Sequence, residues 1–372
     1  MSKRELMVVA GELSGDIHAG NMLAELNRSN LGISAFGVGG ERLSAAGLDL
    51  VASTDELAHM GLVEVLRELP RIRKIMHRLV AEAEIRRPAV AVLVDSPDFN
   101  LRLAARLRKL GIPVVLYVSP QLWAWRRGRV RTVRKLAREV LCILPFEVPF
   151  YEAHNVHARY VGHPLVDEIH RVGLLGRDTT QESGWLAMLP GSRAMEVRQL
   201  LPVMLETLHM MPPSQVKAAV LVEAPGMEAE IGRILAACAT DPRIRRARGE
   251  VRRSELSRCE VAWTASGTAT LECALLDVPM VVGYRLQPIS YALAKLLVRV
   301  SNVALVNLIV GRTVVPELLQ KMWRADRLAA VTSNLLDSDS ANQKTGLSEA
   351  RALLGSPGAS RQAAEAIGEY FS

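Results

Sequence analysis

The segment Ala89-Val90-Ala91-Val92-Leu93-Val94 is a continuous apolar run that leads directly into Asp95-Ser96-Pro97-Asp98-Phe99-Asn100, where a helical pattern begins. A run of this length without a polar position is typical of a strand buried on both faces, as strands are in a parallel sheet. Seven further runs, separated by longer helical patterns, occur at residues 6–10, 114–118, 140–144, 185–189, 218–222, 261–264 and 280–283. This alternation predicts an α/β protein with parallel sheets covered by helices on both faces.

The length of 372 residues exceeds what one hydrophobic core usually organises, so we expect two domains with a cleft between them. The strand pattern stops between Gly162 and Trp185, and its most polar part is 177–183, which we interpret as the linker. We predict an N-terminal domain at 1–170 and a C-terminal domain at 185–340. A helical tail at 341–372 can pack back on the first domain.

The composition is that of an ordinary globular protein, with 49% hydrophobic and 23% charged residues. No apolar run reaches the roughly 18 residues that a membrane span needs. The N-terminal apolar stretch ends at Gly11-Glu12, so we expect no secretory signal and a cytoplasmic protein. Four cysteines without a C-x-x-C pair favour neither disulfides nor a zinc site. The net charge of +7 favours an anionic partner, namely nucleic acid, a phosphate-bearing substrate or a membrane surface.

Polar motifs follow the predicted strands in the first half, where parallel sheets bind their ligands. Asp95 stands at a strand end and is our first choice for a general base that takes a proton from an attacking hydroxyl. Asp98 is the second choice, although it can instead cap the next helix. Glu12 and Ser14 in Gly11-Glu12-Leu13-Ser14-Gly15-Asp16 can face a ligand at a helix N-terminus, or can simply form a capped turn.

Two further features of the first half have competing interpretations. Trp123 and its neighbours in Ser119-Pro120-Gln121-Leu122-Trp123-Ala124-Trp125-Arg126 can stack on a sugar or line an acyl groove, but a core position is equally compatible. Residues 60–80 form a basic amphipathic pattern that can lie in a membrane interface or pack against the core. The basic residues at 126–138 belong to no recognised nucleic-acid motif.

The second half carries two phosphate-type motifs after predicted strands. In Pro190-Gly191-Ser192-Arg193, the glycine allows close approach and Arg193 can neutralise a diphosphate. In Ala265-Ser266-Gly267-Thr268-Ala269-Thr270-Leu271-Glu272, small residues open a helix and Glu272 can accept bonds from ribose hydroxyls. A helix-capping turn explains the presence of Ser192 but gives no structural role to Arg193.

These motifs, with Val281-Val282-Gly283-Tyr284-Arg285 and Asn307-Leu308-Ile309-Val310-Gly311-Arg312, resemble those of lipid-A-disaccharide synthases in order and approximate spacing from about Leu6 to Gln320. The chain departs from the family pattern at Leu13, Val306 and Val310. None of these positions carries a side chain to which we assign chemistry.

The resemblance implies a glycosyltransferase-B fold, in which two Rossmann-like domains face each other across a cleft. It also implies inverting transfer of 2,3-diacylglucosamine from UDP-2,3-diacylglucosamine to 2,3-diacylglucosamine 1-phosphate. The products are a β-1,6-linked disaccharide 1-phosphate and UDP. No metal and no cofactor are expected. The acylated substrates favour peripheral association with the cytoplasmic face of the inner membrane through residues 60–80, with no nucleic acid as partner, and a homodimer is allowed.

The resemblance also assigns the site residues, with Asp95 as the base. The acceptor side of the cleft is expected to carry Glu12, Ser14, Gly15, Asp98, Asn100 and Trp123. The UDP site is expected to carry Gly191, Ser192, Arg193, Ser266, Gly267, Thr268, Glu272, Tyr284, Arg285 and Asn307. Two rivals remain: another enzyme of UDP-N-acetylglucosamine, such as a 2-epimerase, and a basic protein that only binds membranes or nucleic acid.

Overall fold

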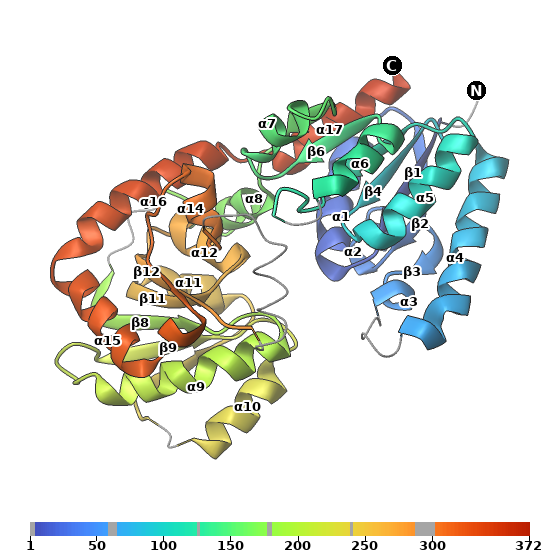
Figure 1. Ribbon diagram of the computed structural model, residues 1–372. Coiled ribbons are helices and arrows are strands. Elements are labelled where there is room, and N and C mark those ends of the chain that lie inside the picture. The colour runs from blue at the N-terminus through green and yellow to red at the C-terminus, as the bar shows by residue number, and fades with distance from the viewer. Residues whose placement is uncertain (1–3, 59–64, 125–126, 177–180, 239–240, 287–301) are drawn as a thin grey trace. The chain divides into compact units, whose positions relative to one another are not determined.

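The computed structural model describes residues 4–58, 65–124, 127–176, 181–238, 241–286 and 302–372. The chain divides into two compact units. Unit 1 comprises Met1–Asp167 together with Pro357–Ser372, and unit 2 comprises Glu168–Ser356. Each unit is built on a parallel sheet with helices on both faces (Figure 1), as the alternation of apolar runs and helical patterns predicts.

Unit 1 contains a seven-stranded sheet in the order β3-β2-β1-β4-β5-β6-β7. All of its strand pairs are parallel. The strands are β1 (Arg4–Ala10), β2 (Ile33–Gly39), β3 (Asp49–Ser53), β4 (Val90–Val94), β5 (Val114–Tyr117), β6 (Glu139–Cys142) and β7 (Ala158–Tyr160). The strand order reverses direction between β1 and β4, and in sheets of this kind ligands bind beyond the carboxyl ends of the strands at such a point.

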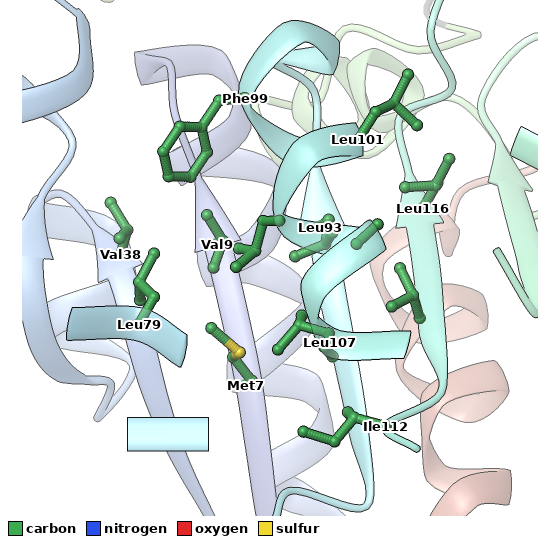
Figure 2. Packing of buried hydrophobic residues seen from close by; sticks show 14 of the residues in the cluster. Met7, Val9, Val38, Leu79, Leu93, Phe99, Leu101, Leu107, Ile112 and Leu116 are labelled. Atoms are coloured by element: carbon green, nitrogen blue, oxygen red, sulfur yellow. The ribbon is translucent and has the colours of Figure 1, made fainter. Parts of the chain in front are cut away.

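Two hydrophobic clusters fill the two faces of the unit 1 sheet. Figure 2 shows the first, in which Leu79 and Leu107 pack against Met7 and Leu93 of the sheet. The second cluster joins the opposite face to α1 and α17. The helical elements of unit 1 are α1 (Leu13–Arg28), α2 (Glu41–Ala45), α3 (Asp55–Ala58), α4 (Val65–Arg86), α5 (Pro97–Lys109), η1 (Arg127–Arg129), α6 (Val130–Leu136), α7 (Glu147–Glu152), α17 (Ala359–Gly368) and η4 (Glu369–Phe371).

Unit 2 contains a six-stranded parallel sheet in the order β10-β9-β8-β11-β12-β13, which reverses direction between β8 and β11. Its strands are β8 (Glu182–Leu189), β9 (Ala218–Val222), β10 (Ile244–Ala247), β11 (Cys259–Ala265), β12 (Met280–Tyr284) and β13 (Glu317–Leu319). Its helical elements are α9 (Ala194–Met210), α10 (Glu228–Ala237), α11 (Val251–Ser257), α12 (Thr268–Leu275), α14 (Leu305–Val310), η2 (Gln320–Met322), α15 (Ala325–Asn334), the π-helix η3 (Leu335–Asp339) and α16 (Ser340–Leu354).

The division between the units falls within α8 (Pro164–Arg171) rather than in the polar stretch 177–183. Of that stretch, residues 177–180 are outside the described part, and Glu182 begins β8 of unit 2. The tail predicted at 341–372 is also divided. Helix α16 packs against α12 and α14 of unit 2, whereas α17 packs against α1 of unit 1.

The amphipathic segment near 60–80 is only partly described, because residues 59–64 are outside the described part. On α4, Ile75, Met76 and Leu79 are buried in the core cluster. The apolar side of this part of the helix therefore faces the sheet, and its basic side faces solvent. No helix in the described ranges combines the length and hydrophobicity that a membrane crossing requires.

Candidate active site

The turns after β1 and β4 meet at the point where the unit 1 sheet reverses its order. A Cβ atom on Gly11 would collide with the Ser96 side chain, so the close approach of the two turns requires glycine at this position. Asp95 and Ser96 have φ values of +52° and +41°, which non-glycine residues rarely adopt. Each such residue costs on the order of 1–3 kcal/mol and persists only where its surroundings enforce it.

The contacts around Asp95 enforce that conformation. The Asp95 N–H donates to the Tyr117 carbonyl at 3.2 Å, which joins the ends of β4 and β5. The Asn100 amide donates to the carbonyls of Val94 at 3.1 Å and Asp95 at 2.8 Å. Asn100 is buried. Asn100 therefore holds the backbone of the Asp95 turn in place. The resemblance places it among the residues that line the acceptor side of the cleft.

Asp98, the other candidate base, has a different environment. Its carboxylate accepts a 2.7 Å hydrogen bond from Arg129, and 66% of the side chain is exposed. Asp95 is half-buried at the strand end itself. The position of Asp95 is thus fixed by the ends of two strands, whereas Asp98 lies in the first turn of α5.

The motif after β1 begins α1. Glu12 occupies the N-cap position in an extended conformation, so Ser14 is not the capping residue that the simplest interpretation of the sequence requires. Glu12 and Ser14 are exposed at this edge. Gly15 is buried, and a Cβ atom added there would lie 3.6 Å from the side chains of Ala10 and Val94. Asp16, which the sequence did not single out, accepts backbone N–H bonds from Gly40, Arg42 and Leu43 and thereby fixes the start of α2.

Trp123 occupies a core position and does not expose a ring face. It is 8% exposed, and its Nε1–H donates to Glu147 at 3.1 Å. Its ring makes an edge contact with Phe146 at 4.9 Å between centroids. Of the two interpretations that the sequence leaves open for this tryptophan, the structure favours the core position.

In unit 2, the turn after β8 brings Gly191, Ser192 and Arg193 onto Glu196 of α9. Gly191 has φ of +117°, and a Cβ there would collide with the Glu196 side chain. The Glu196 carboxylate accepts the Ser192 N–H at 3.2 Å and the Arg193 guanidinium at 2.9 Å. Since the Arg193 side chain is 79% exposed, this ion pair is weak and leaves the guanidinium available to an anion.

The turn after β11 lies at the adjacent strand end. Gly267, with φ of +129°, occupies the N-cap position of α12, and Thr268 is exposed in its first turn. The Ser266 hydroxyl donates to the Val303 carbonyl at 2.7 Å. Glu272 is 8% exposed and accepts a 2.7 Å hydrogen bond from Nε of Arg253. Backbone N–H groups at such a helix start favour a phosphate.

Tyr284 ends β12 and lies near the turn after β8, and Arg285 follows it. The pKa of Tyr284 is raised first by burial and then by the charge of Glu196, while Arg193 lowers it, so the three side chains share one neighbourhood. Arg285 is exposed and lines a surface cavity of about 450 Å³ with Lys321 and Arg324.

Asn307 of α14 stabilises the loop that follows this helix through hydrogen bonds. It is fully buried, its amide nitrogen donates to the Val315 carbonyl and to Glu317, and its oxygen accepts the N–H groups of Val314 and Val315. Any influence of Asn307 on a nucleotide therefore acts through this loop.

Comparisons with known proteins agree with the sequence motifs. The model of the lipid-A-disaccharide synthetase family matches residues 6–369. A lipid-A-disaccharide synthase of Anaeromyxobacter dehalogenans (strain 2CP-C) is 45% identical, covering 98% of this chain and 96% of the relative. The enzyme of Myxococcus xanthus is 41% identical, covering 98% and 97%.

Solved structures agree with the fold. A UDP-GlcNAc 2-epimerase from Neisseria meningitidis bound to UDP-GlcNAc has a TM-score of 0.67 and 12% identity, over 98% of this chain and 100% of that one. The glycotransferase of kitacinnamycin has a TM-score of 0.64 and 16% identity, over the full length of both chains. The likeness shows a glycosyltransferase-B fold made of two parallel-sheet α/β domains, as the resemblance predicts.

Proposed function

The chain belongs to the lipid-A-disaccharide synthetase family and is a glycosyltransferase of lipid A biosynthesis, and we propose that it joins two diacylglucosamine units. The donor is UDP-2,3-diacylglucosamine, and the acceptor is 2,3-diacylglucosamine 1-phosphate. The observation that carries this proposal is the placement of the motifs. A turn that carries a carboxylate stands where the unit 1 sheet reverses, and two glycine-containing turns at helix starts, of a kind that favours anions, stand where the unit 2 sheet reverses.

The proposed reaction is a single displacement with inversion. Asp95 takes the proton of the acceptor 6-hydroxyl as the oxygen forms a bond to the anomeric carbon of the donor. The bond between that carbon and the UDP oxygen breaks, and UDP leaves with the electron pair. Arg193 and the N-terminus of α12 stabilise the negative charge that develops on the diphosphate. Glu272 accepts hydrogen bonds from the ribose. None of these steps uses a metal ion or a cofactor, so turnover should survive an excess of EDTA.

Product analysis tests the proposal. The protein is incubated with the UDP-sugar, with and without the sugar 1-phosphate, and the lipids are examined by mass spectrometry. We expect a disaccharide 1-phosphate and UDP only when both substrates are present. A sugar nucleotide altered without any acceptor would favour the rival 2-epimerase activity. The absence of disaccharide from a protein that still binds UDP would contradict the proposal.

The diphosphate assignment has its own test. Arg193→Ala should weaken UDP binding about tenfold, the usual effect of one charge-assisted hydrogen bond. Arg198→Ala is a matched control, because Arg198 lies on α9, whose N-cap is Arg193, and likewise pairs with a glutamate, Glu230. An unchanged UDP dissociation constant in Arg193→Ala, measured by calorimetry, would remove Arg193 from the site.

We further propose that unit 1 rests on the cytoplasmic face of the inner membrane. Helices α4, α5 and α6 pack side by side, and they expose a basic surface made of Arg71, Arg73, Lys74, Arg78, Arg102, Arg106, Arg108, Lys109, Arg131, Arg134 and Lys135. Each cation near an anionic membrane contributes about 1 kcal/mol. Vesicles containing phosphatidylglycerol should sediment the protein, and the double variant Arg73→Glu with Lys74→Glu should reduce this. Equal binding to pure phosphatidylcholine would contradict the electrostatic contact.

A further inference from the structure

The loop after β5 is fixed by a single buried carboxylate that neither the sequence motifs nor the proposed mechanism uses. Glu147, the first residue of α7, is 1% exposed. Its Oε1 accepts the Ser119 hydroxyl at 2.6 Å and the Trp123 indole N–H at 3.1 Å. Its Oε2 accepts the Leu144 backbone N–H at 3.2 Å. One side chain thus ties the ends of β5 and β6 together.

Aromatic packing completes this anchor. The Tyr151 hydroxyl, one turn along α7, donates to the Pro120 carbonyl at 3.0 Å. The Trp123 ring stands edge-on to Phe146. Residues 119–123 are therefore held at both ends by the segment 144–151. Within the described residues, the hydrogen bonds recorded for the Glu147 carboxylate all come from neutral donors.

The anchor stands next to a strained residue. Val118 has φ of +60°, a conformation that is a genuine outlier for a β-branched side chain. The residue before it, Tyr117, accepts the Asp95 N–H, and the residue after it, Ser119, bonds to Glu147. The left-handed turn at Val118 therefore connects the Glu147 anchor to the turn that presents the candidate base. Strain of this kind persists only when the surroundings impose it.

We propose that Glu147 is a positioning residue of the acceptor side: it fixes the 118–123 loop and thereby the geometry of the Asp95 turn. It touches no reacting atom. The inference rests on the proposed function, because it assigns the acceptor chemistry to Asp95. It adds a requirement that the family motifs do not contain, namely that the loop after β5 is ordered by a carboxylate contributed from α7.

The ionisation of Glu147 supports this assignment. Burial raises its pKa to about 7, against the opposing effect of the hydrogen bonds from Ser119, Trp123 and Leu144. The titratable groups around it are Cys142 on β6, Tyr151 on α7 and Tyr160 on β7. The pKa of each is raised, first by burial and in addition by the charge of Glu147, so all three stay neutral near pH 7. Among these groups, only Glu147 changes its charge near pH 7. Its ionised carboxylate can accept hydrogen bonds on both oxygens, whereas the protonated carboxyl carries an O–H donor on one of them.

The test compares Glu147→Gln with Glu152→Gln, an exposed position at the end of the same helix. Tryptophan is replaced by 5-fluorotryptophan, and the signal of Trp123, one of five, is identified by its loss in Trp123→Phe. In Glu147→Gln we expect the Trp123 fluorine resonance to shift and kcat for disaccharide formation to fall about tenfold, as for one lost charged hydrogen bond. The UDP dissociation constant should stay within about twofold, and Glu152→Gln should match the wild type.

Two further readouts keep the proposal falsifiable. The acidic limb of the wild-type kcat profile should show a group near pH 7 that Glu147→Gln lacks. Should Glu147→Gln fail to fold, Ser119→Ala removes the 2.6 Å bond to Glu147, together with the contact of Ser119 with Tyr151, and leaves the carboxylate in place, so it should give the same changes at smaller size. Wild-type kcat and an unmoved Trp123 resonance in the folded variant overturn the proposal. A wild-type protein that makes no disaccharide contradicts the proposed function instead, while the fluorine shift still reports on the anchor.

Discussion

Nε of Arg253 donates a 2.7 Å hydrogen bond to Oε1 of Glu272, and the same guanidinium also pairs with Glu168. Arg252 reaches the same Oε1 at 3.8 Å. Both arginines approach one oxygen of Glu272, so the proposed ribose contact depends on the other oxygen, Oε2. The carboxylate is thus oriented by cations from α11 before any nucleotide arrives.

Replacement of Arg253 by Gln should therefore weaken UDP binding. The variant leaves Glu272 without its orienting partner, and we expect the UDP dissociation constant to rise about fivefold to tenfold, which corresponds to about 1 kcal/mol. Isothermal calorimetry measures this. Glu272→Gln should have an effect of at least this size. Tighter UDP binding in Arg253→Gln would mean that the arginine competes with the ribose.

The two candidate bases can be separated by substitution. Asp95→Asn should reduce kcat by at least about a hundredfold, the lower end of the range for general base catalysis, with little change in UDP affinity. Asp98→Asn should keep most of the turnover, because the Asp98 carboxylate is exposed and paired with Arg129. Steady-state rates with both substrates decide between them. The reverse ranking would assign the base to Asp98.

Asn307 should matter more for stability than for nucleotide contact. Asn307→Ala leaves the partly buried N–H group of Val314 and the buried N–H group of Val315 without their acceptor. Each orphaned group costs about 1–3 kcal/mol, so the free energy of unfolding should drop by at least about 2 kcal/mol. Urea denaturation followed by circular dichroism measures it. A variant of wild-type stability that has lost UDP binding would instead place Asn307 in direct contact with the ligand.

Asp167 should contribute to stability through the C-terminal helix. Its carboxylate accepts the backbone N–H groups of Gly358, Ala359 and Ser360 at the start of α17. Asp167→Ala removes this cap, which we expect to cost about 1–2 kcal/mol. Asp167→Asn keeps one acceptor oxygen and should cost less. Thermal melts of the three proteins provide the comparison, and equal melting temperatures would contradict the capping role.

The pKa of Glu147 makes stability depend on pH in a defined direction. Its folded value of about 7 lies above the ordinary value of 4.5, so the folded state binds more protons than the unfolded state between these limits. Its contribution is therefore most favourable below pH 4.5 and is lost as the pH rises to about 7. Between pH 4.5 and about 7, the free energy of unfolding of the wild type should fall by on the order of 1–3 kcal/mol relative to that of Glu147→Gln. Denaturant midpoints at a series of pH values test the sign.

The strands that the sequence predicted are the central ones. The strands β1, β4, β5, β6, β8, β9, β11 and β12 are buried, and their sequences therefore form continuous or nearly continuous apolar runs. Strands such as β10, with the sequence Ile244-Arg245-Arg246-Ala247, lie at the edge of a sheet or are too short to give such a run. Half-exposed positions accept polar side chains, so the hydrophobic pattern carries no signal there.

The positions of the site motifs were predictable because parallel strands end at one edge of a sheet. The direction of each side chain was not. Asn100, Trp123 and Asn307 stand in motifs but are buried, since their partners are backbone groups or residues from another element. The supporting residues Asp16, Glu147 and Arg253 bind partners many positions away along the chain. Only the folded chain shows such pairs.

Unit 1 is built from two separate pieces of the chain, and this affects the order in which the two units can finish folding. The core on the α1 face includes Ala363, Ile367 and Phe371, which are synthesised after the whole of unit 2. Unit 2 lies entirely between the two pieces, so its whole sequence is synthesised before unit 1 can bury that face. Nascent domains usually fold from the N-terminus onward. Here the larger piece of unit 1 is translated before unit 2, but unit 1 can finish folding only after unit 2 has been made. A chain that stops before Pro357 would leave an apolar surface of unit 1 uncovered.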